Sequence, residues 1–514
     1  MFISDQPIAD DGEDLLGVAA FAHTIGEAIV RYEAVSGLVF GLFGKWGSGK
    51  TSILNLTLRH IERLMSTVPQ KLIVIRFDPW MFSGQDQLFL QFFEQLATQL
   101  SAQGDGFQEI SRQMRRYGRL FAQSYVPSDP GSERQPRSVP HEAEVDISSL
   151  KQDLTLRLRS RAQKIVIVID DVDRLSDDEI RQVLQIVKSA ANFPYVVYLL
   201  AFDEEIVSAA LSRTYNGRGT EYLEKVIQVG FRVPAVSEVK LYRILSSHLE
   251  RLVDQFPRGR WDEGYWNSVY RSFFQLFTSV RDINRYLNTT QFYVGLLSEE
   301  TNPIDFFLIM ALHVFSPELY AYIRDNRRYF VDRAFDNPLI ANERDRARFR
   351  EVHAQALSHK TRLRKGQLRE VLENLFPIVR DIAENVSVDT SRGQRTWGTQ
   401  KRICSADHFD TYFRLTIPDE RIADSALRAL VASADDFNRL TTELQYLIRD
   451  GGRARYEQMI RQLLDYDWAT ASSTAAVNML ILVMHLVGAQ EISSDYYDIR
   501  TLVGVLLNRI DRDS

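Results

Sequence analysis

The periodicity of hydrophobic residues changes near Pro234. Before it, short apolar runs rich in β-branched residues alternate with stretches whose apolar residues recur at helical spacing. The five runs are residues 38–43, 71–77, 164–169, 195–201 and 227–233. Strands that alternate with helices predict a parallel α/β sheet. After Pro234 the apolar residues recur only at helical spacing, which predicts an all-α region.

The same pattern predicts helices between and after the strands. The predicted helices are residues 18–32, 52–65, 87–100, 147–162, 176 onward, 204–215, 277–287, 303–315 and 475–489. Residues 124–149 interrupt the pattern with serine, proline, glycine and charged residues, which predicts a flexible insertion. We therefore expect an α/β domain over residues 1–235, a helical lid or sensor domain over 236–330 and a C-terminal helical domain over 331–514.

A glycine-rich segment joins the first strand to the helix after it. It reads Gly44-Lys45-Trp46-Gly47-Ser48-Gly49-Lys50-Thr51, and Ser52 continues into the helix. A loop with few side chains wraps a triphosphate closely, and the helix adds the positive end of its dipole. We expect Lys50 to reach the β- and γ-phosphates and the Thr51 hydroxyl to bind Mg²⁺. The alternative is a plain glycine-rich turn before a surface helix.

Two adjacent carboxylates follow the third apolar run. Asp170 and Asp171 come at its C-terminal end, the edge where ligands bind in open α/β sheets. Asp170 is the second expected Mg²⁺ ligand, and Asp171 is placed to polarise the attacking water. The alternative role for both is an N-terminal cap cluster of the helix that starts near Ser176.

Four further residues are candidates for the site, each with a structural alternative. Asp203 ends the fourth run, where it holds the attacking water or a neighbouring cation beside the γ-phosphate, caps the next helix, or does both. Arg281 and Arg285 lie four residues apart, on one helix face. Either one reaches the γ-phosphate, within its own chain or from a neighbouring subunit, or pairs with a surface acid. Arg174 lies either near the site or at a subunit contact.

Composition narrows the functional classes. The chain has 514 residues, a formal net charge of −6 and one cysteine, Cys404. One cysteine excludes an intramolecular disulfide and argues against a cysteine-rich zinc site. Mild acidity gives no reason to expect non-specific nucleic-acid binding, although a local basic patch leaves nucleic acid open. The longest apolar run, 475–489, is shorter than a bilayer span, and the N-terminus lacks a signal-peptide pattern. We expect a cytoplasmic protein without membrane segments.

These motifs together resemble the KAP family of P-loop NTPases. The resemblance covers residues 5–320. It rests on the P-loop, on the helix around Arg281 and on three further segments. They are Phe77-Asp78-Pro79-Trp80, Asp170-Asp171-Val172-Asp173-Arg174-Leu175 and Tyr222-Leu223-Glu224-Lys225-Val226-Ile227-Gln228-Val229. The resemblance implies ATP as the nucleotide and a sheet of order 5-1-4-3-2, numbered along the chain. Many members carry transmembrane helices between the two nucleotide motifs; the polar insertion stands in that place here, which indicates a soluble bacterial member of the phage-exclusion type.

Two functions follow from these expectations. The first is Mg²⁺-dependent ATP hydrolysis by a motor or switch of a bacterial module against phage or plasmids, with partner proteins encoded nearby and a homo-oligomer if an arginine acts in trans. The second is a nucleotide-gated scaffold that turns ATP over slowly and recruits partners through its helical region. A nucleic-acid translocase or nuclease partner is a third class, although no nuclease carboxylate cluster separate from the ATP site is apparent.

Overall fold

The computed structural model divides the chain into two units, each with its own hydrophobic core. The first is Asp5–Lys240, and the second is Leu241–Ser514 together with Met1–Ser4. The structure describes residues 3–33, 36–66, 72–82, 88–124, 141–331, 343–384, 396–415, 422–448, 452–464, 466, 468–488 and 496–511. The three-part division at residues 235 and 330 stays a prediction.

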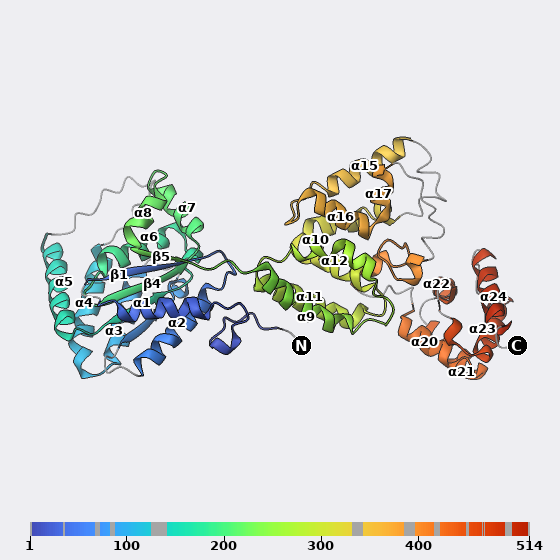
Figure 1. The fold of residues 1–514 in the computed structure, drawn as a ribbon, viewed down its shortest axis with the longest axis horizontal. Coiled ribbons are helices and arrows are strands. Elements are labelled where there is room, and N and C mark those ends of the chain that lie inside the picture. Colours follow the sequence, from blue (N-terminus) through green and yellow to red (C-terminus); the bar gives the residue numbers. More distant parts are fainter. Residues whose placement is uncertain are drawn as a thin grey trace. The chain divides into compact units, whose positions relative to one another are not determined.

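A five-stranded parallel sheet organises the first unit (Figure 1). Its strands are β1 (Leu38–Phe43), β2 (Ile73–Phe77), β3 (Ile165–Ile169), β4 (Val196–Phe202) and β5 (Val229–Arg232). Their order is β2-β3-β4-β1-β5, which confirms the predicted order 5-1-4-3-2. Phe43 pairs with Phe202, and Ile169 pairs with Leu200. The segments that follow β1, β3 and β4 therefore meet at one edge of the sheet.

Helices cover both faces of this sheet. Every residue of β3 and β4 is therefore buried. α1 (Ala19–Arg31) and α2 (Lys50–Met65) pack on one face, and the helices from α3 to α8 pack on the other (Figure 1). The second group is α3 (Leu88–Ser101), α4 (Gln108–Ser124), α5 (His141–Arg161), α6 (Asp177–Gln185), α7 (Glu204–Thr214) and α8 (Gly219–Val226). Short turns are η1 (Asp11–Glu13), η2 (Pro79–Phe82), η3 (Asp105–Phe107), η4 (Val172–Arg174) and a π-helical turn, Ile186–Ala190.

The predicted insertion is shorter than its composition indicated. α5 begins at His141, so residues 141–149 are helical and the prediction of a flexible segment is wrong there. Residues 125–140 lie outside the described residues. α4 was not predicted, because it offers only a narrow apolar stripe, Ile110, Met114 and Tyr117, among many charged residues.

The second unit is helical throughout its described residues, as predicted. Its helices are α9 (Glu238–Val253, which begins in the first unit), α10 (Glu263–Phe274), α11 (Val280–Leu297), α12 (Pro303–Phe315), α13 (Pro317–Asp325), α14 (Arg328–Val331), α15 (Glu343–Ala356), α16 (Lys365–Leu375), α17 (Pro377–Glu384), α19 (Phe409–Arg414), α20 (Asp424–Ser433), α21 (Phe437–Ile448), α22 (Gly452–Leu464), α23 (Ser473–Gly488) and α24 (Tyr496–Asp511), with a short turn Trp468–Thr470. The helices from α20 to α24 form a terminal bundle with a core of its own.

A buried ion pair lies at the start of α12. The Asp305 carboxylate, fully buried, accepts from Arg402 Nε at 2.7 Å and from the Ile403 backbone N–H at 2.8 Å. The Tyr265 hydroxyl donates to its other oxygen, and Arg402 also donates to the Asn374 carbonyl at 2.7 Å. The segment around Arg402 is therefore fixed to α12 through buried hydrogen bonds.

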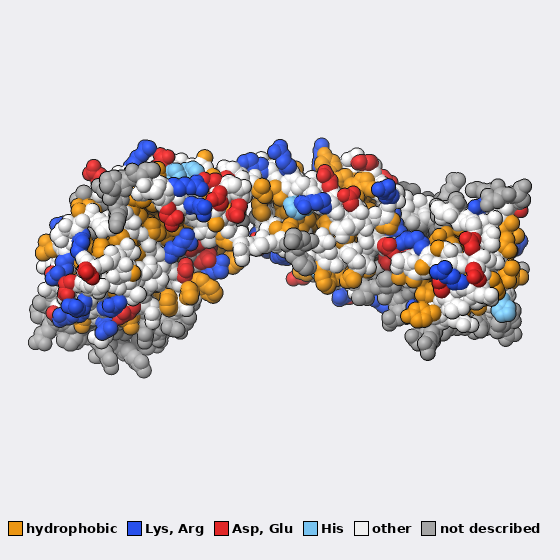
Figure 2. Space-filling view, turned by 90° about the horizontal axis from the view of Figure 1, so that it is seen from below, with side chains coloured by type: hydrophobic (Ala, Val, Ile, Leu, Met, Phe, Trp, Pro, Cys, Tyr) orange, Lys and Arg blue, Asp and Glu red, His pale blue; other side chains and the backbone are white. Residues whose placement is uncertain are grey.

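Two observations concern the expected partners. Among the described residues, no single helix is both long enough and apolar enough to span a bilayer, whereas α12 and α13, bent by 119° at their junction, pass that test as a pair. On the face drawn in Figure 2, basic and acidic side chains are interspersed over the described residues.

Candidate nucleotide site

The P-loop segment turns tightly between β1 and α2. Gly47 and Gly49 adopt left-handed backbone conformations, with φ of 79° and 90°, which favour glycine. α2 starts at Lys50 directly after Gly49, and no side chain caps its first turn. A Cβ at Gly49 would meet nothing within 4 Å. A helix N-terminus without a side-chain cap, behind an uncrowded glycine, has the features of a phosphate-binding helix start.

Lys50 lies inside this loop. Its side chain is 8% exposed, and Nζ donates to the Gly44 carbonyl at 2.8 Å. The same nitrogen lies 3.6 Å from Asp173 Oδ2. Asp173 Oδ1 and Ser48 Oγ are buried without a hydrogen-bond partner among the described residues. A buried hydroxyl in the loop and a buried lysine fit a bound phosphate, since both donate hydrogen bonds to anionic oxygens.

The expected metal ligands are in direct contact. The Thr51 hydroxyl donates to Asp170 Oδ2 at 2.7 Å, and the Asp171 backbone N–H donates to Asp170 Oδ1 at 2.8 Å. Burial raises the pKa of Asp170, and the Thr51 hydrogen bond partly opposes this rise. A hydroxyl and a carboxylate are hard oxygen ligands that suit Mg²⁺. The described residues contain no group of three His, Cys, Asp or Glu able to hold a metal, so phosphate and water would complete such a site.

Asp171 sits in a strained turn and is engaged by Arg174. Its φ of 57° and ψ of 35° are left-handed, an uncommon conformation for any residue other than glycine. Arg174 contacts Asp171 Oδ2 at 3.0 Å, and its guanidinium carbon lies 4.9 Å from the ring centre of Trp46. Burial raises the pKa of Asp171, and Arg174 opposes that rise. Arg174 therefore connects the acidic turn to the P-loop.

The structure settles the alternative cap role for all three carboxylates, Asp170, Asp171 and Asp203. Ser176 caps α6 with a capping box through Glu179, so neither Asp170 nor Asp171 has the alternative cap role. Asp203 is 8% exposed and does cap α7, accepting from the Glu205 N–H at 3.0 Å. Asp203 also follows Phe202, whose carbonyl accepts from the Gly44 N–H at 3.2 Å, so it adjoins the P-loop. Its role beside a γ-phosphate stays a prediction.

The remaining predicted residues have other surroundings. Ser52 lies in the first turn of α2, and its hydroxyl accepts from the Ile8 N–H at 3.3 Å. Lys45 lies 3.5 Å from Glu205 on the surface. Arg281 and Arg285 belong to α11 of the second unit, where Arg285 donates to the Val314 carbonyl. Their action on a nucleotide stays a prediction.

Sequence reasoning assigned no role to Asp173, which the structure brings beside Lys50. Asp173 lies in η4, whose N-terminal cap Asp171 is left-handed, so its direction depends on the backbone turn after β3. That turn brings Asp170 to Thr51 and Asp173 to Lys50. No spacing rule in the sequence predicts this geometry.

Comparisons with known proteins agree with this geometry. The model of the KAP family P-loop domain matches residues 18–294, more than half of the chain. The phage T7 exclusion protein of Escherichia coli (strain K12) is 24% identical over 483 residues, covering 84% of this chain and 62% of that protein. The chain thus spans about three fifths of that relative's length.

Solved structures show only distant likeness. The Walker-type ATPase of Pyrococcus abyssi is 15% identical, with a TM-score of 0.32, over 75% of this chain and 100% of that one. Cdc6p of Pyrobaculum aerophilum is 11% identical, with a TM-score of 0.33, over 74% of this chain and 100% of that one. TM-scores of this size support no inference about the present chain.

Proposed function

The chain belongs to the KAP family of P-loop proteins, and from this premise we propose that it is a Mg²⁺-dependent ATPase, the motor or switch of a bacterial module that excludes phage or plasmids. The observation that carries the proposal is the convergence of Lys50, Thr51 and Asp170 at one edge of the sheet. The name of the E. coli relative supports the phage-exclusion part.

Each residue then has a defined task. The N-terminus of α2 and Lys50 bind the phosphates, and Lys50 exchanges its bond to the Gly44 carbonyl for bonds to the β- and γ-oxygens. Thr51 and Asp170 would hold Mg²⁺, whose charge would offset that of the phosphates. Asp171 orients the attacking water as a general base. Asp173 holds the Lys50 ammonium in place by attraction across 3.6 Å.

The catalytic test uses the full chain with Mg²⁺ and ATP. Lys50→Ala should abolish nucleotide binding, because the only buried ammonium at the described P-loop is lost. Asp171→Asn should keep binding and lower turnover by about 10²–10⁴-fold, the usual contribution of a general base. Lys225→Ala, an exposed lysine on α8, is the matched control. Binding and turnover that survive Lys50→Ala would exclude the proposal.

The cellular test measures phage plating on bacteria that produce the chain with the genes encoded beside it. Wild type should lower plating efficiency, and Lys50→Ala should restore it to the level of an empty strain. Equal plating on both strains would contradict the exclusion role and leave the ATPase assignment untouched.

The Arg174–Asp171 pair favours the second candidate, a nucleotide-gated scaffold with slow turnover. The Arg174 guanidinium at 3.0 Å makes Asp171 a weaker base than its burial alone would make it, because it opposes the rise of the Asp171 pKa. Single-turnover kinetics with retained nucleotide separate the two: slow hydrolysis and slow release identify the scaffold. In that case Arg174→Ala should speed the chemical step, whereas in a fast ATPase it should not.

Oligomer formation and action in trans are tested together. Sizing the protein with and without Mg²⁺-ATP shows whether nucleotide assembles it. If Arg281 acts on a neighbouring subunit, mixing Lys50→Ala with Arg281→Ala chains should recover activity that neither has alone. DNA-stimulated turnover, sensitive to salt, would assign the nucleic-acid role that the net charge does not favour.

A further inference from the structure

A cavity of about 320 Å³, lined by both charged and apolar residues, lies within the second unit. One wall is formed by Arg260 and residues 398–401, and the other by residues of α20, α22 and the turn Trp468–Thr470. The second wall belongs to the terminal bundle, which has its own core. The cavity therefore lies where two separately packed groups of helices meet.

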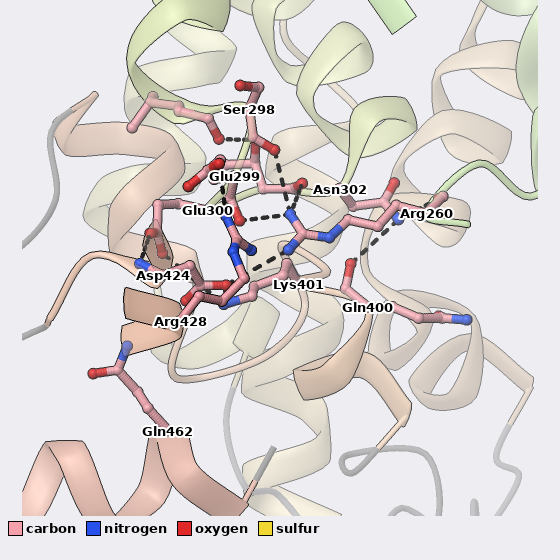
Figure 3. A network of polar contacts seen from close by, with 12 residues as sticks. Arg260, Ser298, Glu299, Glu300, Asn302, Gln400, Lys401, Asp424, Arg428 and Gln462 are labelled. Atoms are coloured by element: carbon pink, nitrogen blue, oxygen red, sulfur yellow. Dashed lines mark hydrogen bonds and ion pairs between the residues drawn. The ribbon is translucent and has the colours of Figure 1, made fainter. Parts of the chain in front are cut away.

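Two cations of the lining are fixed by buried partners. The Arg260 side chain is 14% exposed, and it donates to the backbone carbonyls of Glu299 at 2.6 Å and of Ser298 and Thr301 at 3.3 Å. Its guanidinium also pairs with the Asp424 carboxylate at 3.5 Å. Lys401, 11% exposed, contacts the Asp424 and Glu300 carboxylates (Figure 3). Both positive groups are thus held in position by the protein itself, as a preorganised binding site requires.

The third cation is held weakly. Arg428 of α20 is 43% exposed and pairs with Glu299, also 43% exposed, at 2.6 Å (Figure 3). Exposed pairs of this kind contribute little stability, because water solvates both partners. Arg428 can therefore exchange Glu299 for another anion, while the released Glu299 carboxylate stays solvated.

We propose that this cavity binds a small phosphate-bearing molecule, up to the size of a mononucleotide, through Arg260, Lys401 and Arg428. Three cations and one carboxylate, Asp424, line it, and guanidinium and ammonium groups are the usual partners of phosphate. Its volume lies at the small end of ligand sites. Leu427 and Tyr466 add an apolar wall for a carbon skeleton or ring.

Such a ligand would couple the two groups of helices. Its phosphate would touch Arg260 and Lys401 on one wall and Arg428 on the other, so that binding favours the arrangement in which both walls are present. Burial lowers the pKa of Arg260, and the Asp424 carboxylate opposes this fall, as a bound phosphate would. The proposal stands independently of ATP turnover.

The test titrates AMP and inorganic phosphate, each by calorimetry, into the full chain carrying Lys50→Ala, which removes the P-loop contribution. One saturable site per chain is expected. Arg428→Gln should weaken binding by about tenfold, the effect of losing one charge-assisted bond. Glu299→Gln should strengthen it, because the competing carboxylate is gone. Arg439→Gln, which alters an exposed arginine paired with Glu443 elsewhere in the bundle, should leave it unchanged.

The outcomes separate two sources of the phosphate. AMP binding more tightly than inorganic phosphate supports a nucleotide-like ligand that uses the Leu427 and Tyr466 wall, and equal binding supports recognition of the phosphate group alone. Absence of saturable binding for both probes at millimolar concentration would overturn the proposal. So would equal affinities of Arg428→Gln and its parent.

Discussion

Charged residues are buried in both units, but they are satisfied differently. In the second unit Asp305 receives hydrogen bonds from Arg402, Ile403 and Tyr265, all within the chain. In the first unit Asp173 keeps one oxygen without a partner among the described residues, and burial raises the pKa of Asp170. A buried carboxylate whose hydrogen bonds are completed by the protein, such as Asp305, needs no ligand for its charge. A buried carboxylate oxygen that lacks a hydrogen-bond donor indicates that a ligand supplies one.

The largest expected effect tests the satisfied charge. Asp305→Ala should lower the free energy of unfolding by about 3–5 kcal/mol, because it leaves the Arg402 guanidinium buried without its carboxylate. Urea unfolding measures the change. Asp325→Ala, an exposed acid next to Arg324, should change it by less than about 0.5 kcal/mol. A small loss at Asp305 would remove the contrast between the two units.

The next effect tests the unsatisfied charge. Saturating Mg²⁺-ATP, at about one hundred times its Kd, should raise the free energy of unfolding of the wild-type chain by about 2.7 kcal/mol. Lys50→Ala should lose this ligand-dependent increment, whatever its effect on the ligand-free protein. Thermal unfolding with and without Mg²⁺-ATP gives the increment, with Lys225→Ala as control. An increment that survives would show that the ligand binds elsewhere.

Thr51→Val sharpens the comparison within the site itself. Losing the hydroxyl removes the 2.7 Å bond to Asp170, which should cost about 1 kcal/mol of stability, and should abolish the Mg²⁺ dependence of nucleotide affinity. Thr51→Ser keeps the hydroxyl and should retain both. Nucleotide titrations with Mg²⁺ and with EDTA measure this dependence. Equal affinities in the wild type under the two conditions would contradict a role for Mg²⁺ in the site.

The smallest effect concerns pH. The pKa of Asp170 is raised in the folded state, so in the window between its ordinary and its raised value the folded chain holds a proton that the unfolded chain releases. Stability of the ligand-free protein should therefore fall as pH rises through that window. Asp170→Asn should reduce this fall, while Asp171 and Asp381, whose pKa values burial also raises, keep the remainder. Urea unfolding over a pH series, with the exposed Glu221→Gln as control, measures it.

The sheet was predictable from the sequence because its strands are unusually continuous. Residues 165–169 are five β-branched residues, all buried, and such a run has few alternatives to a central strand. The strand order came from the resemblance to a family, since periodicity does not specify neighbours. α4 and the first residues of α5 were missed because many charged and polar residues interrupt their apolar pattern.

The site was predictable in its residue types and less so in its contacts. Gly-rich spacing pointed to Lys50 and Thr51, and an acidic strand end pointed to Asp170. The Lys50–Asp173 and Asp171–Arg174 contacts depend on the backbone turn after β3. The sequence pattern does not predict the conformation of this turn. The functional roles of these residues, and of Arg281, stay predictions.

The left-handed backbone of Asp171 bears on how an inactive reference protein should be made. Side chains at successive positions of a regular strand point to opposite faces. After β3 the strand geometry ends in the left-handed turn at Asp171, with φ of 57°. In this turn Asp170 contacts Thr51 and Asp171 contacts Arg174. Asparagine tolerates this conformation nearly as well as aspartate, whereas alanine and β-branched residues do not. An alanine at this position would therefore confound lost chemistry with a distorted loop, and a trap for bound nucleotide is better built with asparagine.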